Sequence, residues 1–390
     1  MNRVYLDYNA TAPLRTEARA AMMPHLAGMC GNASSVHSFG HRAKIALESS
    51  RREVALLIGA DPGCVVFTAG GSEANNLALF GAARAAPAGA RRVVTSAFEH
   101  PSVSSVIDDL EQSGFDIVRV APGGDGVVDA DRFLDAATPG TTAFASLMLA
   151  NNEVGTLQPV AAIGAELRRR GIPFHCDAAQ GIGKIPTDVN RLDVDLLTLA
   201  AHKFGGPQGV GALFIREGMG LVPHLLGGGQ EMHRRPGTEN IAAIAGLGAA
   251  AQAVRNAEDE IRRMTSLQRR LEVGIEQRGL AGTINGGAAP RIPNTTSLAF
   301  PGTTGEALVV ALDLEGIAVS AGSACSAGTL RNSPSLQAMG RPVEAGCSIR
   351  ISFGHATSSD DIDRLLDALG RVLPALRSAG QPVAVTRSRS

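Results

Sequence analysis

Residues 195–215 read DLLTLAAHKFGGPQGVGALFI, an apolar run that leads into a histidine, a lysine and a glycine-rich loop. The apolar run at 195–200 is typical of a strand buried in a sheet. A lysine directly after such a strand loses hydration, which disfavours its charged form and makes its amine more nucleophilic. Lys203 is therefore a candidate for Schiff-base chemistry, although taken alone it could equally be an exposed lysine in a glycine loop.

Similar apolar runs precede this stretch and alternate with segments of helical spacing, such as 73–86 and 161–170. These runs are CVVFT at 64–68, RRVVTSAF at 91–98, TTAFASLML at 141–149 and PFHCDA at 173–178. Such alternation predicts an α/β fold with a mainly parallel sheet covered by helices.

Downstream of residue 239 the pattern changes. Residues 239–278 are alanine-rich and then charged, which predicts a long connecting helix or a helix pair. The later segments TTSLAFPG, GIAVSAG and CSIRISFG read as strands mixed with helices, and the last helix begins where Ser358 and Asp361 can cap each other. This half of the pattern predicts a smaller α+β domain.

With 390 residues the chain exceeds the usual size of a single core, so two domains are expected. We expect a large α/β domain at 16–260 and a small α+β domain formed by 1–15 and 261–378. The end of the chain, 379–390, is polar and lacks large apolar residues, so we expect a flexible tail.

Composition excludes several classes of protein. Hydrophobic residues make up 44% of the chain, enough for an ordinary globular core. The formal charge of -1 gives no field that attracts nucleic acid or anionic lipid. The start, MNRVYLDYNATAPL, has no signal-peptide core, and no stretch approaches 18 uninterrupted apolar residues. We therefore expect a cytoplasmic protein without nucleic-acid or membrane partners.

Five cysteines are scattered along the chain without any C-x-x-C pair, which argues against a disulfide framework or a thiolate zinc site. A buried free thiol is the default expectation for each of them. They are Cys30, Cys64, Cys176, Cys325 and Cys347.

The stretch CVVFTAGGSEANNLALFG at 64–81 predicts a strand that ends at Thr68, a glycine turn, and a helix that begins near Ser72 or Glu73. A helix N-terminus presents unpaired N–H groups and the positive end of its dipole, which suits a phosphate group. Ser72 could donate its hydroxyl to that phosphate or simply cap the helix. The turn is neither a P-loop nor a GxGxxG, and many similar turns bind nothing.

HCDAAQ at 175–180 places Asp177 at the end of a predicted strand, where ligand groups of α/β sheets usually lie. Alone, this carboxylate could just as well cap the next helix. Pyridoxal phosphate (PLP) needs a lysine, an acidic partner for its pyridine nitrogen, and donors around its phosphate. Lys203, Asp177 and Ser72 supply these three groups from strand ends or turns of one domain.

The chain also resembles a known family. YLDYNATAPL, GGSEANNLA, EHPSV, NNEVGTLQP, HCDAAQGIGK, AHKFGGPQGVGALF, RRPGTENI, SAGSACSAG and SIRISFG are similar to motifs of the class V, fold-type-I PLP enzymes. Within that class they resemble the cysteine desulfurases of the NifS/IscS type that serve iron–sulfur assembly. The resemblance extends in unbroken order from residue 4 to about residue 370.

The resemblance implies roles for individual residues. Lys203 forms the Schiff base, and Asp177 and Gln180 contact the pyridine nitrogen and the ring oxygen. His100 stacks on the ring and helps to move protons. Asn152 lies near a cofactor oxygen and the substrate carboxylate, which Arg350 binds with its fork of donors.

The phosphate in such enzymes is held by the turn, by the histidine before the lysine, and by a threonine of the partner subunit, which implies a homodimer. The residues concerned are Gly71, Ser72, His202 and Thr238. Asn9 and Asn32 are further candidates for lining the substrate pocket. Two positions depart from the family pattern: Ala200 replaces a frequent serine, which predicts weaker cofactor binding, and Ala33 replaces a frequent proline in GNASS.

Cys325 lies among Ser, Ala and Gly in SAGSACSAG, as expected of a hydrophilic loop where a thiolate is reachable. The resemblance implies that it takes sulfur from L-cysteine as a persulfide, leaving L-alanine, and passes it to an acceptor such as an iron–sulfur scaffold. We expect His100 to accept the Cys325 proton. The other four cysteines are interpreted as structural.

Two alternatives remain open. Another class V enzyme, such as a selenocysteine lyase or an aminotransferase, would share Lys203 and Asp177 without needing a loop cysteine. A scaffold of the same fold could mainly bind assembly partners. His37 and His41 have the i,i+4 spacing of zinc ligands, but no third ligand can be named, so no metal is expected.

Overall fold

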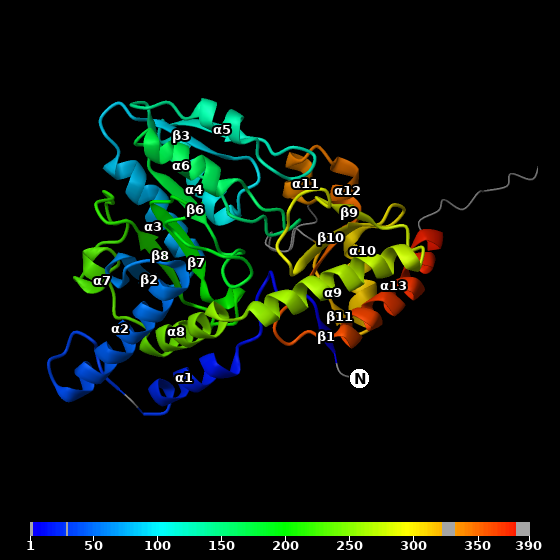
Figure 1. Cartoon of the computed structure of the whole chain (residues 1–390), viewed down its shortest axis with the longest axis horizontal. Coiled ribbons are helices and arrows are strands. Elements are labelled where there is room, and N and C mark those ends of the chain that lie inside the picture. Colours follow the sequence, from blue (N-terminus) through cyan, green and yellow to red (C-terminus); the bar gives the residue numbers. More distant parts are fainter. Residues whose placement is uncertain (1–2, 29, 322–331, 380–390) are drawn as a thin grey trace, which may run out of the picture.

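A computed structural model describes residues 3–28, 30–321 and 332–379 (Figure 1). Its largest feature is a seven-stranded sheet with the order β2-β8-β7-β6-β5-β3-β4. The neighbours from β4 through β7 pair in parallel, whereas β8 is antiparallel to both β7 and β2. The strands are β2 (Val65–Thr68), β3 (Arg92–Ser96), β4 (Asp116–Val120), β5 (Thr142–Ser146), β6 (Phe174–Asp177), β7 (Leu196–Ala200) and β8 (Gly211–Ile215).

Helices cover both faces of this sheet, and the predicted mainly parallel α/β fold is confirmed. Successive side chains of a strand enter different cores: Val65 and Phe67 pack on one face and Val66 on the other. Burial on both faces explains why the strands are continuous apolar runs. The helices are α1 (Thr16–Leu26), α2 (Ser38–Ile58), α3 (Gly71–Ala85), α4 (Pro101–Gln112), α5 (Ala130–Ala136), α6 (Val160–Arg169), α7 (Gln230–His233) and α8 (Ile241–Arg255).

The antiparallel direction of β8 follows from the length of the connection that precedes it. The connection 201–210 between β7 and β8 is too short for the helical crossover that a parallel neighbour requires. It contains only a short 3-10 turn, Ala201–Lys203, before the glycine-rich loop. Lys203 is therefore held at the edge of the sheet by a tight reversal of the chain.

A second, separate core is formed mostly by residues after 260 and also includes Val4 and Leu6. Its antiparallel sheet has the order β12-β10-β9, and a short parallel pair joins β1 to β11. The elements are β1 (Val4–Tyr5), β9 (Thr283–Asn285), β10 (Thr295–Ala299), β11 (Ile317–Ala318), β12 (Ser348–Ser352), α9 (Glu258–Gln277), α10 (Gly305–Leu314), α11 (Pro334–Ala338), α12 (Pro342–Cys347) and α13 (Ser359–Ala379). The exact domain boundaries at 15 and 260 stay predictions.

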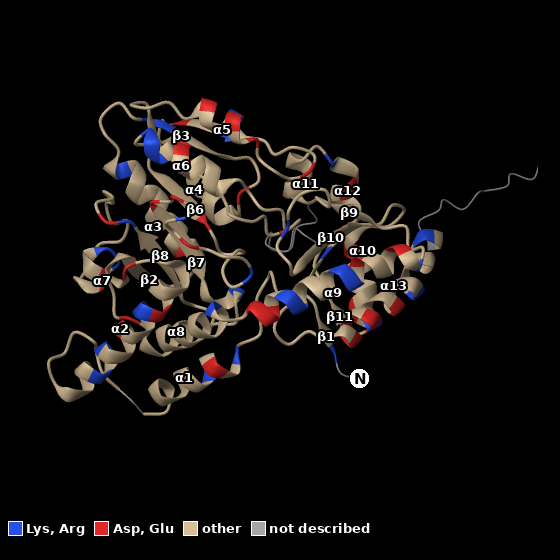
Figure 2. Cartoon of the chain, viewed as in Figure 1, with Lys and Arg blue, Asp and Glu red and all other residues tan. Residues whose placement is uncertain are grey.

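The expected connection between the two cores is a helix pair, α8 followed by α9, and Figure 1 shows α9 running from the large sheet to the smaller one. The predicted cap of the last helix is also present, because Ser358 and Asp361 exchange hydrogen bonds between side chains and backbone N–H groups. Both helices α9 and α13 carry basic and acidic residues (Figure 2), and Arg270 of α9 pairs with Asp363 of α13.

The N-terminal segment after β1 lies between the two cores. The Asn9 backbone N–H donates to Ser352 of β12, and the Asn9 carbonyl accepts a hydrogen bond from Lys203. Residues 7–11 therefore connect the smaller sheet to the turn after β7. None of the helices in the described part of the chain is both long enough and apolar enough to cross a membrane.

The described cysteines are all free, but they differ in exposure. Cys176 and Cys347 are buried, and burial raises the pKa of the Cys176 thiol well above its usual value. Cys64 is partly buried. Cys30 is exposed, so the expectation of a buried thiol is wrong there: it lies in the loop between α1 and α2 rather than in a core. Cys325 lies outside the described residues.

Candidate active site

A cavity of ≈ 270 Å³ opens at the edge of the large sheet where the parallel strands end. Strand β6 ends there at Asp177 and β7 at Ala200, as expected for the ligand-binding edge of an α/β sheet. The cavity brings together most of the predicted site residues. Its lining includes Gly71, Ser72, His100, Asn152, Asp177, Gln180, Ala200, His202 and Lys203.

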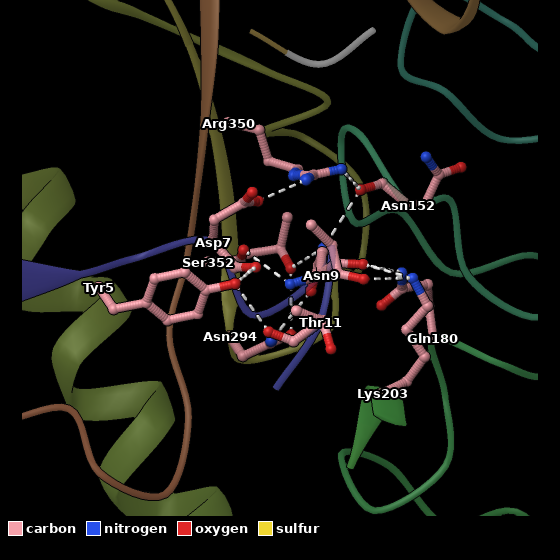
Figure 3. A network of polar contacts seen from close by, with 12 residues as sticks. Tyr5, Asp7, Asn9, Thr11, Asn152, Gln180, Lys203, Asn294, Arg350 and Ser352 are labelled. Atoms are coloured by element: carbon pink, nitrogen blue, oxygen red, sulfur yellow. Dashed lines mark hydrogen bonds and ion pairs between the residues drawn. The ribbon is translucent and has the colours of Figure 1, made fainter. Parts of the chain in front are cut away.

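Lys203 points from the turn after β7 toward the N-terminal segment. Its Nζ donates to the carbonyl oxygens of Asn9 at 2.7 Å and Ala10 at 3.1 Å (Figure 3). The side chain is only half-buried. The amine is therefore held in one direction by two acceptors while it lines the cavity.

Asp177 is buried, with 7% of its surface exposed. Its Oδ2 accepts a hydrogen bond from Asn75 Nδ2 at 2.8 Å, and its Oδ1 accepts one from the Ala179 N–H at 3.0 Å. Asn75 also donates to Ser102, while its own Oδ1 is buried without a partner among the described residues. A carboxylate held this way can face a protonated pyridine nitrogen.

His100 caps the N-terminus of α4. Its Nδ1 accepts the backbone N–H of Ser102 at 3.1 Å and lies 2.8 Å from the Ser102 hydroxyl. Because a backbone N–H can only donate, Nδ1 is unprotonated and the neutral ring carries its proton on Nε2. Burial lowers the pKa of His100; nearby Asp177 opposes the change and Lys203 adds to it. The capped ring is thus a donor at Nε2.

The residues predicted to bind the phosphate lie in the first turn of α3. Gly71 begins the helix, and a Cβ at this position would lie 3.2 Å from the Ala200 Cβ, so glycine permits close approach of helix and strand. Ser72 lies beside it at the cavity edge. Ala200 itself lines the cavity, so the hydroxyl that a serine would add there is absent.

His202 lines the same cavity as Gly71 and Ser72. Its Nδ1 lies 3.2 Å from the Thr11 hydroxyl, and burial lowers the pKa of His202 to about 4, with Lys203 and His100 acting in the same direction. The imidazole is therefore neutral at pH 7. A neutral ring beside the N-terminus of α3 offers an anion one hydrogen bond, while the helix end supplies backbone N–H groups.

Arg350 lies on β12, buried at 3% exposure, and reaches the site through Asn152. Its Nη2 pairs with Asp7 Oδ1 at 2.6 Å, and its Nη1 donates to the Asn152 carbonyl at 3.0 Å (Figure 3). Its Nε is buried without a partner among the described residues. An unpaired donor on a buried guanidinium is suited to a carboxylate ligand.

The remaining predicted residues are placed differently. Asn9 is buried, and its side chain bonds Asn152 and Thr295 rather than lining the cavity. Asn32 lies on the exposed loop before α2, where its side chain caps the local turn at Ser34, so the structure does not bring it to the cavity of its own chain.

Thr238 is exposed and does not line the cavity of its own chain in the part that the structure describes. His37, weighed above as a metal ligand, caps α2 by accepting the Gly40 N–H.

Sequence reasoning missed Asp7, Asn75 and Lys184, all of which contact predicted site residues. Each stands inside a motif quoted above, so the motif was visible but the residue's role was not.

The described residues fit PLP. An amine, a buried carboxylate and a helix N-terminus face one cavity, and the orphaned Oδ1 of Asn75 shows that polar capacity in its wall is unused. Lys203 would hold the cofactor aldehyde, Asp177 its ring nitrogen, and the first turn of α3 with His202 its phosphate.

Comparisons with known proteins identify the family of this chain. Residues 4–365 match the family "Aminotransferase class-V". A cysteine desulfurase IscS from Dictyoglomus turgidum is 42% identical over 377 residues, covering 96% of this chain and 95% of the relative.

Two solved structures are also similar. A NifS-like protein superposes with a TM-score of 0.89 at 32% identity, covering 96% of this chain and all of that one. The structure of SspA in complex with cysteine has a TM-score of 0.80 at 32% identity, covering 90% of this chain and 99% of that one. The resemblance inferred from the motifs is confirmed, and the chain belongs to the class V aminotransferase family of PLP-dependent enzymes.

Proposed function

We propose that this chain is a cysteine desulfurase that converts L-cysteine to L-alanine and takes the sulfur on Cys325 as a persulfide. The observation that carries the proposal is the convergence of Lys203, Asp177 and His100 on one cavity at the sheet edge. The names of the relatives support the choice of substrate, since relatives about 40% identical over nearly the whole chain are cysteine desulfurases.

Bound PLP withdraws electrons from the substrate Cα, which makes the Cα proton removable. Asp177, buried and fixed by Asn75, would hold the ring nitrogen. Arg350, whose Nε is buried without a partner among the described residues, would bind the substrate carboxylate and orient the substrate. Lys203, directed by the carbonyls of Asn9 and Ala10, takes the Cα proton as a general base.

The sulfur step then forms an S–S bond and breaks a C–S bond. The Cys325 thiolate attacks the substrate sulfur, the electron pair of the C–S bond stays on the substrate carbon, and that carbon takes a proton. In balance, one cysteine and one enzyme thiol give one alanine and one enzyme persulfide.

The orientation of His100 changes the role that the sequence suggested for it. With Nδ1 occupied by the Ser102 N–H, the neutral ring offers Nε2–H and has no free lone pair for the Cys325 proton. We therefore assign His100 a different role, in which its Nε2–H stays on the ring and donates a hydrogen bond to sulfur that stabilises the thiolate. The proton that Cys325 loses before the attack and the proton that the product carbon takes are both exchanged with solvent.

A homodimer is part of the proposal, with Thr238 reaching the phosphate of the partner subunit. A hollow beside α3 supports it: Leu225 there is half-exposed, while His224 Nδ1 and Arg234 Nη1 are buried without partners among the described residues. Apolar and unpaired polar groups together are typical of a surface that another chain covers.

The dimer is tested by sedimentation and by PLP retention. Thr238→Ala should weaken PLP binding by about 2–150-fold, the range that spans one neutral hydrogen bond and one to a charged group. Thr141→Ala, on an exposed loop of the same domain, is the matched control and should bind PLP normally. A fully active monomer, or unchanged PLP binding in Thr238→Ala, would contradict this arrangement.

We further propose that the persulfide sulfur passes to an iron–sulfur scaffold or a related acceptor protein, in the cytoplasm. The free state of the described cysteines supports a reducing compartment. Analysis of the reaction products distinguishes a cysteine desulfurase from the two alternative class V enzymes, an aminotransferase and a selenocysteine lyase. The desulfurase should release alanine and sulfide in equal amounts from L-cysteine with a reductant, whereas an aminotransferase would release a 2-oxo acid, and a selenocysteine lyase would require selenocysteine.

A further inference from the structure

The chain has only three lysines, Lys44, Lys184 and Lys203, among its 36 basic residues. Lys44 is exposed on α2, but Lys184 is buried, with 5% of its surface exposed. Its Nζ donates to Gln180 Oε1 at 2.8 Å and to Asn9 Oδ1 at 3.2 Å. No step proposed above uses this amine.

Lys184 and the Asn9 carbonyl together fix which way the Gln180 amide is turned. An amine that donates must face the amide oxygen, so Gln180 Oε1 is directed to Lys184 and its NH₂ group points the other way. One N–H of that group donates to the Asn9 carbonyl at 3.0 Å. Because Gln180 lines the cavity, the remaining N–H is available there as a donor.

The same amine orients the side chain of Asn9. Its Oδ1 accepts from Lys184 and from Asn294 Nδ2 at 3.1 Å, which leaves its Nδ2 to donate to Asn152 and Thr295. Asn9 is thereby fixed between the two cores. Its backbone carbonyl then accepts from both Gln180 Nε2 and Lys203 Nζ, as Figure 3 shows for these three labelled residues.

The surroundings of Lys184 explain why a lysine stands there. Its amine donates to two neutral amide oxygens, and burial lowers the pKa of Lys184 well below its usual value, with Lys203 and Arg350 acting in the same direction. These two contacts use two of the N–H groups of the amine. Arginine would keep its charge in this position and would have to bury it.

We propose that Lys184 is a positioning residue for the cofactor: by holding Gln180 Oε1 and Asn9 Oδ1, it makes Gln180 present an N–H donor to the cofactor ring oxygen. This inference rests on the assignment of Gln180 as the ring-oxygen contact under the proposed function. Without Lys184 the Gln180 amide keeps only its bond to the Asn9 carbonyl, so its N–H toward the ring oxygen is held less firmly.

The test is a double-mutant cycle on PLP binding, with Lys184→Met and Gln180→Leu made singly and together. Methionine nearly preserves the length and volume of the lysine stem but removes the donor. Each single change should weaken PLP binding by about 10-fold, as expected for one hydrogen bond. The double variant should bind no more weakly than Gln180→Leu, because Lys184 acts through Gln180. Lys44→Met should match the wild type.

A spectroscopic readout separates positioning from general damage to the fold. A donor at the ring oxygen favours its ionised form, so Lys184→Met should raise the pH at which the long-wavelength absorbance of bound PLP changes. Lys184→Gln keeps an N–H donor at this position, so the pH of its absorbance change should lie closer to that of the wild type. This variant replaces Lys184→Met in the test if the methionine variant does not fold.

The inference would be overturned if the losses of PLP affinity in the two single variants multiplied in the double variant. An unchanged absorbance titration in both Lys184 variants would also overturn it. Neither readout depends on sulfur transfer. A failure to form alanine from cysteine would therefore count against the proposed function and leave this inference standing, and the reverse also holds.

Discussion

At the scale of single residues, the proposed chemistry depends on the amine of Lys203, whose contacts differ from those of Lys184. Lys203 is aimed by two backbone carbonyls, whereas Lys184 is buried and engaged with two amide oxygens. We predict that Lys203→Ala abolishes the borohydride-reducible link between protein and PLP, together with all turnover, because neither other lysine presents a usable amine to the cavity. Peptide mapping after reduction checks this. The matched control, Lys44→Ala, should keep both, and a PLP-linked peptide containing Lys184 would refute the assignment.

At this scale the sequence predicts the main site residues, but not the residues that hold them in place. Lys203, Asp177 and Ser72 were predictable because each follows a strand or a glycine turn, and these positions meet at one edge of an α/β sheet. Asn75 and Asp7 were not, because their partners are 102 and 343 residues away in the chain, and no local pattern carries such a pairing.

At the scale of elements, α7 contains an unusual turn. Glu231, Met232 and His233 all have positive φ, at 46°, 57° and 61°, which is unfavourable for residues with a side chain. Glu231 is buried and accepts hydrogen bonds from both Nη atoms of Arg51 at 2.7 Å and from the Phe67 N–H. This ion pair fastens the left-handed turn to α2 and β2, just before the segment that contains Thr238.

We predict that Glu231→Gln lowers the free energy of unfolding by about 3–5 kcal/mol, because it removes the buried partner of the Arg51 charge and leaves only the half-exposed carboxylate of Glu48 beside it. Thermal or urea unfolding measures the loss. The control is Asp363→Asn, which breaks the exposed pair with Arg270 on α9 and α13 and should change stability by only about 0–1 kcal/mol. Similar losses in the two variants would show that the turn is not held by this pair.

Element types were largely predictable from periodicity, as the confirmed α8–α9 pair illustrates. The direction of β8 was not read from the sequence, although the shortness of the 201–210 connection explains it once the strand pairing is known. The left-handed turn of α7 was also missed, because its stability comes from Arg51, 180 residues earlier in the chain.

At the scale of the whole molecule, buried histidines link stability to pH. Burial lowers the pKa of His175 to about 4, while nearby Asp177 opposes the change, and its ring lies between Ser146 and Thr198. Unfolding restores an ordinary pKa near 6.5. Between these two values the unfolded chain binds more protons, so the free energy of unfolding falls as the pH falls from about 6.5 to 4.

We predict that His175 alone contributes up to about 3 kcal/mol to this loss. Burial raises the pKa of Glu99 to about 8, which reduces stability as the pH rises and so works in the opposite sense. The measurement is therefore a difference: urea unfolding of the wild type and of His175→Gln at a series of pH values. The gap in unfolding free energy between them should shrink as the pH falls, and a constant gap would contradict the prediction.

The most direct test of sulfur transfer to Cys325 is the position of the sulfur itself. After incubation with L-cysteine, alkylation and mass spectrometry of the whole set of cysteine peptides should find one extra sulfur atom on Cys325. Cys325→Ala should still change the PLP absorbance on adding cysteine but carry no persulfide and release almost no sulfide. Because Cys30 is the exposed thiol among the described cysteines, extra sulfur on Cys30, or undiminished turnover in Cys325→Ala, would show that Cys325 is not the nucleophile.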